Sequence, residues 1–202
     1  MTTIRCAQPE DRDQITRLID LAFFDLDANR LLVPDTAQRS RVMQRYFDIH
    51  VDHALRHGAW VDLALADDGA LVGAALWYVS GDPGPTDYDQ RLANAVGPDR
   101  LDRFHTFDAQ LHEHTPTTPH DYLGFLAVDP TRQRSGIGGQ LLHEHHKRMD
   151  IRRRPTYLVA SNSDSARLYQ RHGYRPLPDG HAQLVLPNGG RMWRMWREST
   201  AV

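Results

Sequence analysis

The chain has 202 residues, of which 25% are charged and 40% are hydrophobic, and its formal net charge at pH 7 is -2. This length suffices for one domain with a sizeable core, and the near-neutral balance gives no overall attraction to nucleic acid or to a membrane surface. No apolar run approaches a membrane span, the first residues lack a signal-peptide core, and Cys6 is the single cysteine. We therefore expect a cytoplasmic protein without an intrachain disulfide, in which Cys6 has a packing role.

The first part of the chain predicts a short strand, two helices and a hairpin. Residues 3–7 have the composition of a strand, and residues 9–24 predict a helix because their apolar residues recur at helical spacing. Residues 25–34 are expected to form a loop, and a long helix is expected from Asp35 to about Arg56. Two strand-like runs, 60–66 and 71–79, flank the turn signal Asp67-Asp68-Gly69 and predict a β-hairpin.

A polar segment, residues 82–119, separates this hairpin from the last part of the chain. It opens with a Gly- and Pro-rich break and predicts two short helices between Asp87 and about His114, split at Gly97-Pro98. Strands are then predicted at 122–128 and 156–160, each followed by a helical stretch, at 140–150 and about 163–172. Three short strands are expected at 174–177, 183–186 and 192–196. Strands with helices between them predict one domain, residues 1–202, with a mixed sheet covered on both faces.

The turn between residues 122–128 and 140–150 is rich in glycine, and it reads Gln-Arg-Ser-Gly-Ile-Gly-Gly at 133–139. A strand, a glycine-rich turn and a helix in this order predict a phosphate-binding site. Glycines let the backbone approach a ligand, and the first helical turn has free N–H groups. A P-loop would need Lys-Ser or Lys-Thr after the glycines, and a dinucleotide fingerprint would need a third glycine where Leu141 stands. A purely structural glycine turn is the alternative.

Two segments carry a resemblance to a known family. Residues 133–138 fit the pattern Gln/Arg-x-x-Gly-x-Gly/Ala, and residues 162–174 fit Asn-x-x-Ala/Ser-x-x-x-Tyr-x-x-x-Gly-Phe/Tyr. In this order and at this spacing they resemble the two motifs of the GNAT superfamily of N-acetyltransferases. Residues 168–174 and the ending 190–197 are most similar to the puromycin-type antibiotic N-acetyltransferases. The resemblance covers about the last two-fifths of the chain with specific motifs, and the remainder weakly.

The resemblance implies both a fold and a co-substrate. The fold is of the α/β (α+β) class: a mixed, mostly antiparallel sheet of about seven strands, helices on both faces, and a splay between the fourth and fifth strands. The co-substrate is acetyl-CoA, whose pantetheine arm would lie in that splay. Arg132 or the basic run 152–154 is a candidate for the ribose 3′-phosphate, although a solvated helix end is the simpler interpretation of that run. The other expected contacts of the coenzyme are Leu126, Ala127, Val128, Gln133, Arg134, Ser135, Gly136, Ile137, Gly138, Gly139 and Asn162.

Acetyl transfer to an amine needs a neutral amine, stabilisation of the thioester oxygen and a proton for the departing thiolate. The resemblance places Tyr169 at the family's general-acid position, while a packed helix tyrosine is the alternative. Backbone N–H groups near residues 126–128 are the expected donors to the oxyanion. The general base stays open between His120, Asp121, Tyr122 and a chain of water molecules.

The expected acceptor is a primary amine on a small molecule, bound in a pocket that the insertion 82–119 walls. Trp77, Tyr78 and Tyr122 are candidates for the aromatic surface of this pocket, although a core strand residue is the simpler interpretation of each. One alternative is a protein acetyltransferase that acts on an N-terminus or a lysine and has an open acidic groove. Another is a non-catalytic sensor of acyl-CoA. Similar proteins are commonly homodimers, and nothing in this sequence decides the oligomeric state.

The chain contains 12 histidines, and three of them, His143, His145 and His146, cluster within four residues. They do not form the H-E-x-x-H arrangement of a zinc site. We therefore expect no metal and interpret the three as surface residues.

Overall fold

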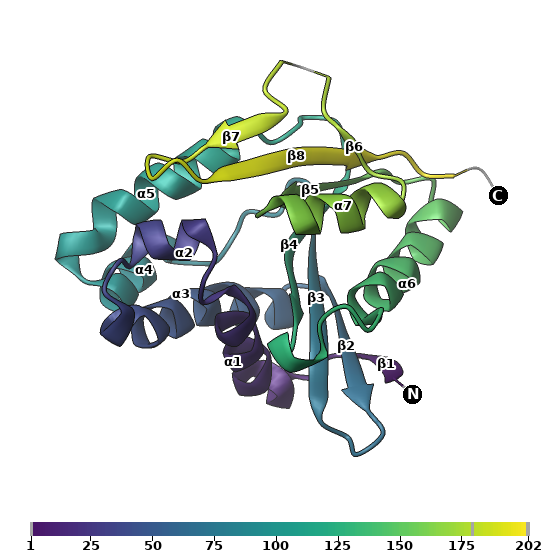
Figure 1. Ribbon diagram of the computed structural model, residues 1–202, viewed down its shortest axis with the longest axis horizontal. Coiled ribbons are helices and arrows are strands. Elements are labelled where there is room, and N and C mark those ends of the chain that lie inside the picture. Colours follow the sequence, from purple (N-terminus) through teal and green to yellow (C-terminus); the bar gives the residue numbers. More distant parts are fainter. Residues whose placement is uncertain (1, 179, 201–202) are drawn as a thin grey trace.

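A sheet of eight strands runs through the described part of the chain (Figure 1). The structure is a computed structural model that describes residues 2–178 and 180–200. The strand order is β1-β2-β3-β4-β5-β8-β6, with β7 paired to β8, and every pair is antiparallel except β4 and β5. This arrangement confirms the expected mixed, mostly antiparallel fold. The strands are β1 (Thr2–Cys6), β2 (Trp60–Ala66), β3 (Leu71–Val79), β4 (Asp121–Val128), β5 (Thr156–Ala160), β6 (Arg175–Pro176), β7 (Gln183–Val185) and β8 (Arg191–Arg197).

Two of the helices in the first layer begin at local capping signals. Asp35 accepts a hydrogen bond from the N–H of Ala37 (2.9 Å) at the start of α3, and Pro98 occupies the first turn of α5 directly after Gly97. No helix among the described residues is long and apolar enough to cross a membrane. The α-helices are α1 (Arg12–Phe23), α2 (Asp27–Leu32), α3 (Thr36–Arg56), α4 (Tyr88–Val96), α5 (Pro98–Glu113), α6 (Ile137–Ile151) and α7 (Ser163–Arg171).

The expected loop at residues 25–34 is wrong, because this segment contains α2. A helix of six residues is too short to show a helical repeat in the sequence. Tertiary contacts stabilise it instead: Ala28 packs in a small cluster with Leu184, Leu186 and Met192 from the end of the chain.

Two layers of helices cover the two faces of the sheet (Figure 1). Helices α1, α3, α4 and α5 pack on one face and α6 and α7 on the other. Side chains of β3 alternate between the two cores, so that Leu76 belongs to the first and Trp77 to the second. The second core also contains Tyr169 of α7 and Met195 of β8.

Two expectations about single residues are wrong. Cys6 is exposed, because it ends β1, a strand at the edge of the sheet with one neighbour. His145 and His146 of α6 are buried, whereas His143 is exposed. Burial lowers the pKa of both buried imidazoles, which are therefore neutral. Their rings pack against aromatic side chains in the core.

The splay between β4 and β5 is confirmed. Their pairing covers the first three residues of each strand and ends at Leu123 opposite Leu158. The next residue, Gly124, lies at an irregularity in the β3–β4 register. A Cβ at Gly124 would lie 2.6 Å from Cε2 of Tyr78, so this position requires glycine. From Gly124 onward β4 is bonded to β3 alone, and its other edge is open.

Candidate active site

The open edge of β4 presents backbone groups of alternate residues. The N–H of Asp129 donates to the carbonyl of Val72 in β3 (3.0 Å). Because backbone groups point to opposite edges at successive residues, every second residue before Asp129 also directs its N–H and C=O to β3. The polar groups of Leu126 and Val128 therefore face the opening, whereas those of Ala127 face β3. In agreement, the carbonyl of Val128 accepts from Nε2 of Gln133 (3.4 Å). The opening thus offers two residues whose N–H and C=O groups face away from β3.

The glycine-rich turn directly follows this open edge. Its backbone adopts left-handed values at Arg134 (φ 64°) and Gly136 (φ 89°), and α6 begins at Ile137. Within residues 2–178 and 180–200, the N–H groups of residues 133–139 donate no hydrogen bond. Successive free N–H groups at a helix start form a site for an anion, and the exposed Arg132 and Arg134 add positive charge.

Two glycines of α6 also permit close packing against α7. A Cβ at Gly139 would lie 3.0 Å from Nε2 of His172, and one at Gly138 would lie 3.4 Å from Cδ2 of Leu168. These positions let the two helices that flank the opening approach each other. The sequence 133–139 therefore combines a loop with free N–H groups and a helix–helix contact.

Helix α7 places Tyr169 at the opening. Asn162 caps this helix: its Oδ1 accepts from the N–H of Ser165 (2.8 Å), and its own N–H donates to Oγ of Ser165 (3.2 Å). Tyr169 is 7% exposed and lines the large cavity described next. Its hydroxyl makes no hydrogen bond with the described residues, and burial raises its pKa. The phenol is protonated at neutral pH and able to donate.

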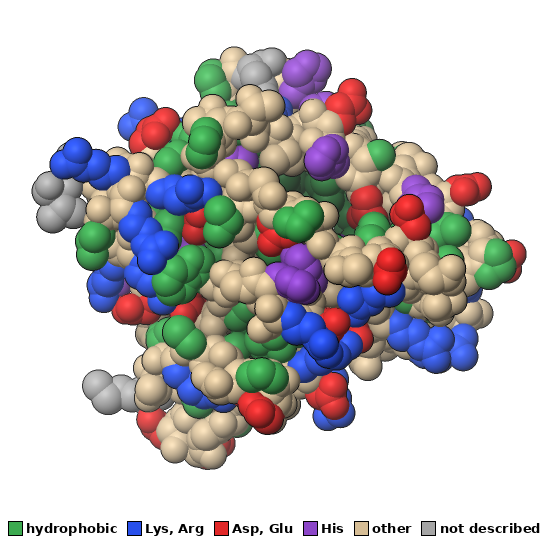
Figure 2. Space-filling view, turned by 180° about the vertical axis from the view of Figure 1, so that it is seen from behind, with side chains coloured by type: hydrophobic (Ala, Val, Ile, Leu, Met, Phe, Trp, Pro, Cys, Tyr) green, Lys and Arg blue, Asp and Glu red, His purple; other side chains and the backbone are tan. Residues whose placement is uncertain are grey.

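A cavity of about 1120 Å³ extends from the open edge of β4 to the helices of the first layer. The molecule is hollowed on the face seen from behind, with acidic and histidine side chains beside the hollow (Figure 2). Tyr78 and Tyr122 line the cavity as predicted, but Trp77 does not, because it points to the other face and stacks on His145 (3.9 Å). Segments of 82–119 form a large part of the wall.

The three side chains considered for the general base differ in their surroundings. Asp121 is buried away from the cavity, where its Oδ1 accepts from Nε of Arg154 (2.5 Å) and its Oδ2 lies 3.2 Å from Nε2 of His145. Arg154 is thereby fixed in an ion pair, whereas Arg152 and Arg153 are exposed at the end of α6, as the interpretation of 152–154 as a solvated helix end expects. Tyr122 lines the cavity, but burial raises its pKa.

His120 also lines the cavity. Its Nδ1 lies 2.6 Å from the carbonyl of Thr118, so we assign the proton to Nδ1 and leave Nε2 as an acceptor. Burial lowers its pKa, so that the ring is neutral at pH 7.

Sequence reasoning missed a polar group on the first helix layer. Asp108 of α5 accepts hydrogen bonds from the hydroxyls of Tyr46 (3.0 Å) and Tyr88. Nε2 of His53 lies 2.6 Å from Oδ1 of Asp82, and both residues line the cavity. The one available signal was the spacing of residues 46, 50 and 53 on α3, which places them on one face of that helix.

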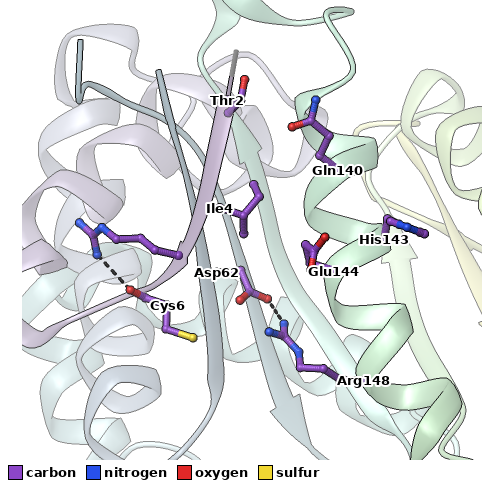
Figure 3. A pocket seen from close by; sticks show the side chains of 9 residues that line it. Thr2, Ile4, Cys6, Asp62, Gln140, His143, Glu144 and Arg148 are labelled. Atoms are coloured by element: carbon purple, nitrogen blue, oxygen red, sulfur yellow. Dashed lines mark hydrogen bonds and ion pairs between the residues drawn. The ribbon is translucent and has the colours of Figure 1, made fainter. Parts of the chain in front are cut away.

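A second, smaller recess of about 450 Å³ lies between β1 and α6 (Figure 3). Its lining is mostly polar, and its charged groups are already paired: Asp62 with Arg148, and Arg5 with Asp11. It shares no lining residue with the large cavity. Across the described residues no group of three or more His, Cys, Asp or Glu side chains is placed to hold a metal ion.

Comparison with known proteins gives a consistent class. Residues 105–176 match the family model described as an acetyltransferase (GNAT) domain. A structure titled histone acetyltransferase HPA2 and related acetyltransferase, from Corynebacterium glutamicum, has 22% identity and a TM-score of 0.76 and covers 100% of this chain and 98% of that chain. Arylalkylamine N-acetyltransferase 2 from Aedes aegypti has 13% identity and a TM-score of 0.65, with coverage of 98% and 99%.

A third similar structure is titled as the NatC complex bound to Gag peptide and CoA, with 13% identity, a TM-score of 0.55 and coverage of 98% and 99%. No curated protein matches the chain. The matched segment contains β4, the glycine-rich turn, α6, β5 and α7. Residues 105–176 therefore match a GNAT acetyltransferase domain, and the similar structures share the fold of the chain.

Proposed function

We propose that the protein transfers an acetyl group from acetyl-CoA to a primary amine of a small molecule, by direct attack within a ternary complex. One observation carries the proposal. The open edge of β4 and the phenol of Tyr169 lie at one end of the large cavity, and the free N–H groups of residues 133–139 follow directly after β4 in the chain.

The coenzyme would lie along the opening. In this proposal the backbone groups of Leu126 and Val128 bond the amides of the pantetheine arm, while Ala127 keeps its bonds to β3. The N–H groups of residues 133–139 hold the pyrophosphate, with the charge of Arg134 beside them. We expect Asn162 to contact the coenzyme from the start of α7, and its side-chain nitrogen takes no part in the cap bonds.

The same elements supply the chemistry. Tyr169 is protonated and donates its proton to the departing thiolate. A backbone N–H at the open edge of β4 stabilises the oxyanion. Among the side-chain candidates for the base His120 fits best, acting directly or through water, because its Nε2 is an acceptor and the ring lines the cavity.

The cavity supports a small acceptor over a protein. Its walls are aromatic over a large part, with Phe47, Tyr88, Phe107 and Phe125 among the lining residues. Such walls fit a compact organic amine. The resemblance of the motifs to puromycin-type enzymes extends the proposal to antibiotic amines.

Thiol release from acetyl-CoA with a panel of amines, puromycin and short peptides tests this proposal. We expect turnover with a small amine, and Tyr169→Phe should lower kcat about 10²-fold with little change in the Kd for CoA. The matched control is Tyr174→Phe, because that buried tyrosine bonds Thr156 and His146 and does not line the cavity.

Each outcome has a distinct meaning. Full turnover in the Tyr169→Phe variant removes the general-acid role. Turnover with peptides alone would mean that the acceptor is a protein and not a small molecule. Binding of CoA without thiol release for any amine supports a sensor, and failure of the wild-type protein to bind CoA overturns the whole proposal.

A further inference from the structure

The carboxylate of Asp108 is half-buried at the cavity wall and has no role in the acetyl transfer proposed above. It is held by two hydroxyls: Oδ1 accepts from Tyr46 (3.0 Å) and Oδ2 accepts from Tyr88. Three helices meet at this point, since Tyr46 lies on α3, Tyr88 on α4 and Asp108 on α5. The position of the carboxylate is therefore set by the packing of the whole first layer.

The two hydroxyls are neutral and do not balance a negative charge on Asp108. Burial raises the pKa of this carboxyl, while the bonds from Tyr88 and Tyr46 lower it. Within residues 2–178 and 180–200 no Lys or Arg forms an ion pair with Asp108. The nearby His105 is directed at Asp89 (3.4 Å). By contrast Asp52, which lies on α3, is paired with Arg12, Arg56 and Arg91. A carboxylate accepts about four hydrogen bonds, so Asp108 keeps capacity for a donor in the cavity.

The cavity as a whole favours a positive charge. The described residues that line it include Asp82, Asp108 and Glu113 but no Lys or Arg. His50 sits beside the cluster, its ring 4.9 Å from that of Tyr46 and 5.6 Å from that of Tyr88. Burial lowers the pKa of His50 to about 4, so that it is neutral at pH 7 and does not supply the missing cation.

The aromatic rings around Asp108 also favour a ligand with an apolar or aromatic frame. The ring of Tyr46 contacts that of Phe104 (5.0 Å between centroids), and the ring of His50 lies 5.8 Å from that of Phe125 on β4. Aromatic faces next to a carboxylate attract a cation on an apolar or aromatic frame.

The cluster belongs to the same chamber as the acetyl-transfer site. Burial raises the pKa of Tyr122, and the neighbouring Tyr157, Asp108 and Tyr169 raise it further, in that order. Asp108, Tyr122 and Tyr169 all line the same cavity.

We propose that the cavity selects acceptors that carry a protonated nitrogen on an aromatic or apolar body, and that Asp108, held by Tyr46 and Tyr88, pairs with this nitrogen. The inference rests on the proposed function, because it names the class of amine that enters the acceptor side. It makes Asp108 a specificity-determining residue, and Tyr46 and Tyr88 positioning residues.

Binding of three matched probes tests the charge preference without any chemistry. The probes are 2-phenylethylamine, N,N,N-trimethyl-2-phenylethylammonium and neutral 2-phenylethanol, each titrated into the wild-type protein by calorimetry. We expect both cations to bind at least about tenfold more tightly than the alcohol. Asp108→Asn should abolish this ratio, because the amide preserves the shape but has no charge.

The matched control is Asp102→Asn, which removes one negative charge from an exposed position on the same helix and should keep the wild-type ratio. Tyr46→Phe serves as a second variant, and it should reduce the ratio in part. Unfolding temperatures of all variants establish that they are folded.

Three results would overturn the inference: equal binding of cation and alcohol by the wild-type protein, an unchanged ratio in Asp108→Asn, or no binding of any probe. CoA is titrated in a separate arm. Loss of CoA binding by the wild-type protein counts against the proposed function, whereas intact CoA binding with no charge preference counts against the role of Asp108 alone.

Discussion

At the scale of single residues, three buried or half-buried histidines, His50, His145 and His146, serve as neutral side chains. His146 lies in the α6–α7 core, and its Nε2 is 3.0 Å from the hydroxyl of Tyr174. His145 stacks on Trp77. Burial lowers the pKa of His146 to about 3 and that of His50 to about 4. In the folded protein neither ring takes up a proton near neutral pH. The unfolded chain does bind these protons at mildly acidic pH, so the free energy of unfolding depends on pH.

The direction of that dependence follows from linkage. In the unfolded chain a histidine has a pKa of about 6.5, so between that value and about 3 the unfolded state binds the proton and the folded state does not. The free energy of unfolding should therefore fall as the pH falls below about 6.5, by at most about 1.4 kcal/mol per pH unit for each such imidazole.

Urea unfolding between pH 7.5 and 4.5 measures this slope. The variant His146→Gln keeps an acceptor for Tyr174 and cannot titrate, so its slope should be shallower than that of the wild-type protein. His143→Gln, at the exposed neighbour, should leave the slope unchanged. Identical slopes in all three proteins would contradict the assignment of a depressed pKa to His146.

At the scale of elements, the turn that joins β4 to α6 depends on backbone conformation more than on side chains. Gly136 has φ 89° and open space where a Cβ would stand, so it is required for its backbone angle and not for close packing. Together with the left-handed Arg134 it shapes a turn whose N–H groups make no hydrogen bond with the described residues.

Gly136→Ala should weaken binding of CoA about tenfold, because relief of the left-handed strain moves the N–H groups away from their common direction. Gly69→Ala is a matched control: Gly69 has φ 82° and equally open space, but it lies in the β2–β3 turn. Both variants should lose similar stability, and calorimetry should show weaker CoA binding in the first alone. Equal affinities in the two variants would show that the turn does not hold the coenzyme through its backbone.

At the scale of the whole molecule, two cores on opposite faces of one sheet have different tasks. In the proposed function the α6–α7 core supports the coenzyme side, and the core of α1, α3, α4 and α5 forms a wall of the cavity proposed to hold the acceptor. Phe104 is fully buried in the latter, four residues before Asp108 on α5, and packs edge-on against Tyr46. Stability and the proposed recognition of the acceptor therefore depend on the same set of contacts.

Phe104→Ala should cost about 3–5 kcal/mol of unfolding free energy, because it leaves a cavity beneath α5. Leu21→Ala, at a position that is 56% exposed, should change stability by less than about 0.5 kcal/mol. Urea unfolding measures both. A loss below about 1 kcal/mol in Phe104→Ala would mean that α5 does not rely on this core.

Local patterns determined much of the architecture from the sequence alone. The hairpin at 60–79, the break at Gly97-Pro98, the cap at Asp35 and the glycine-rich turn all depend on neighbours within a few positions, so a linear pattern suffices to place them. The same holds for the two motifs that resemble the GNAT superfamily, because each lies on one turn and one helix.

Tertiary structure alone decided the rest. Helix α2 is stabilised by contacts with the end of the chain, and the burial of His145 and His146 depends on which face of α6 meets the sheet. The cluster of Tyr46, Tyr88 and Asp108 joins residues 20 and 62 positions apart. Such groups carry no common sequence signal, because the free energy that brings them together comes from the packing of three helices on one sheet.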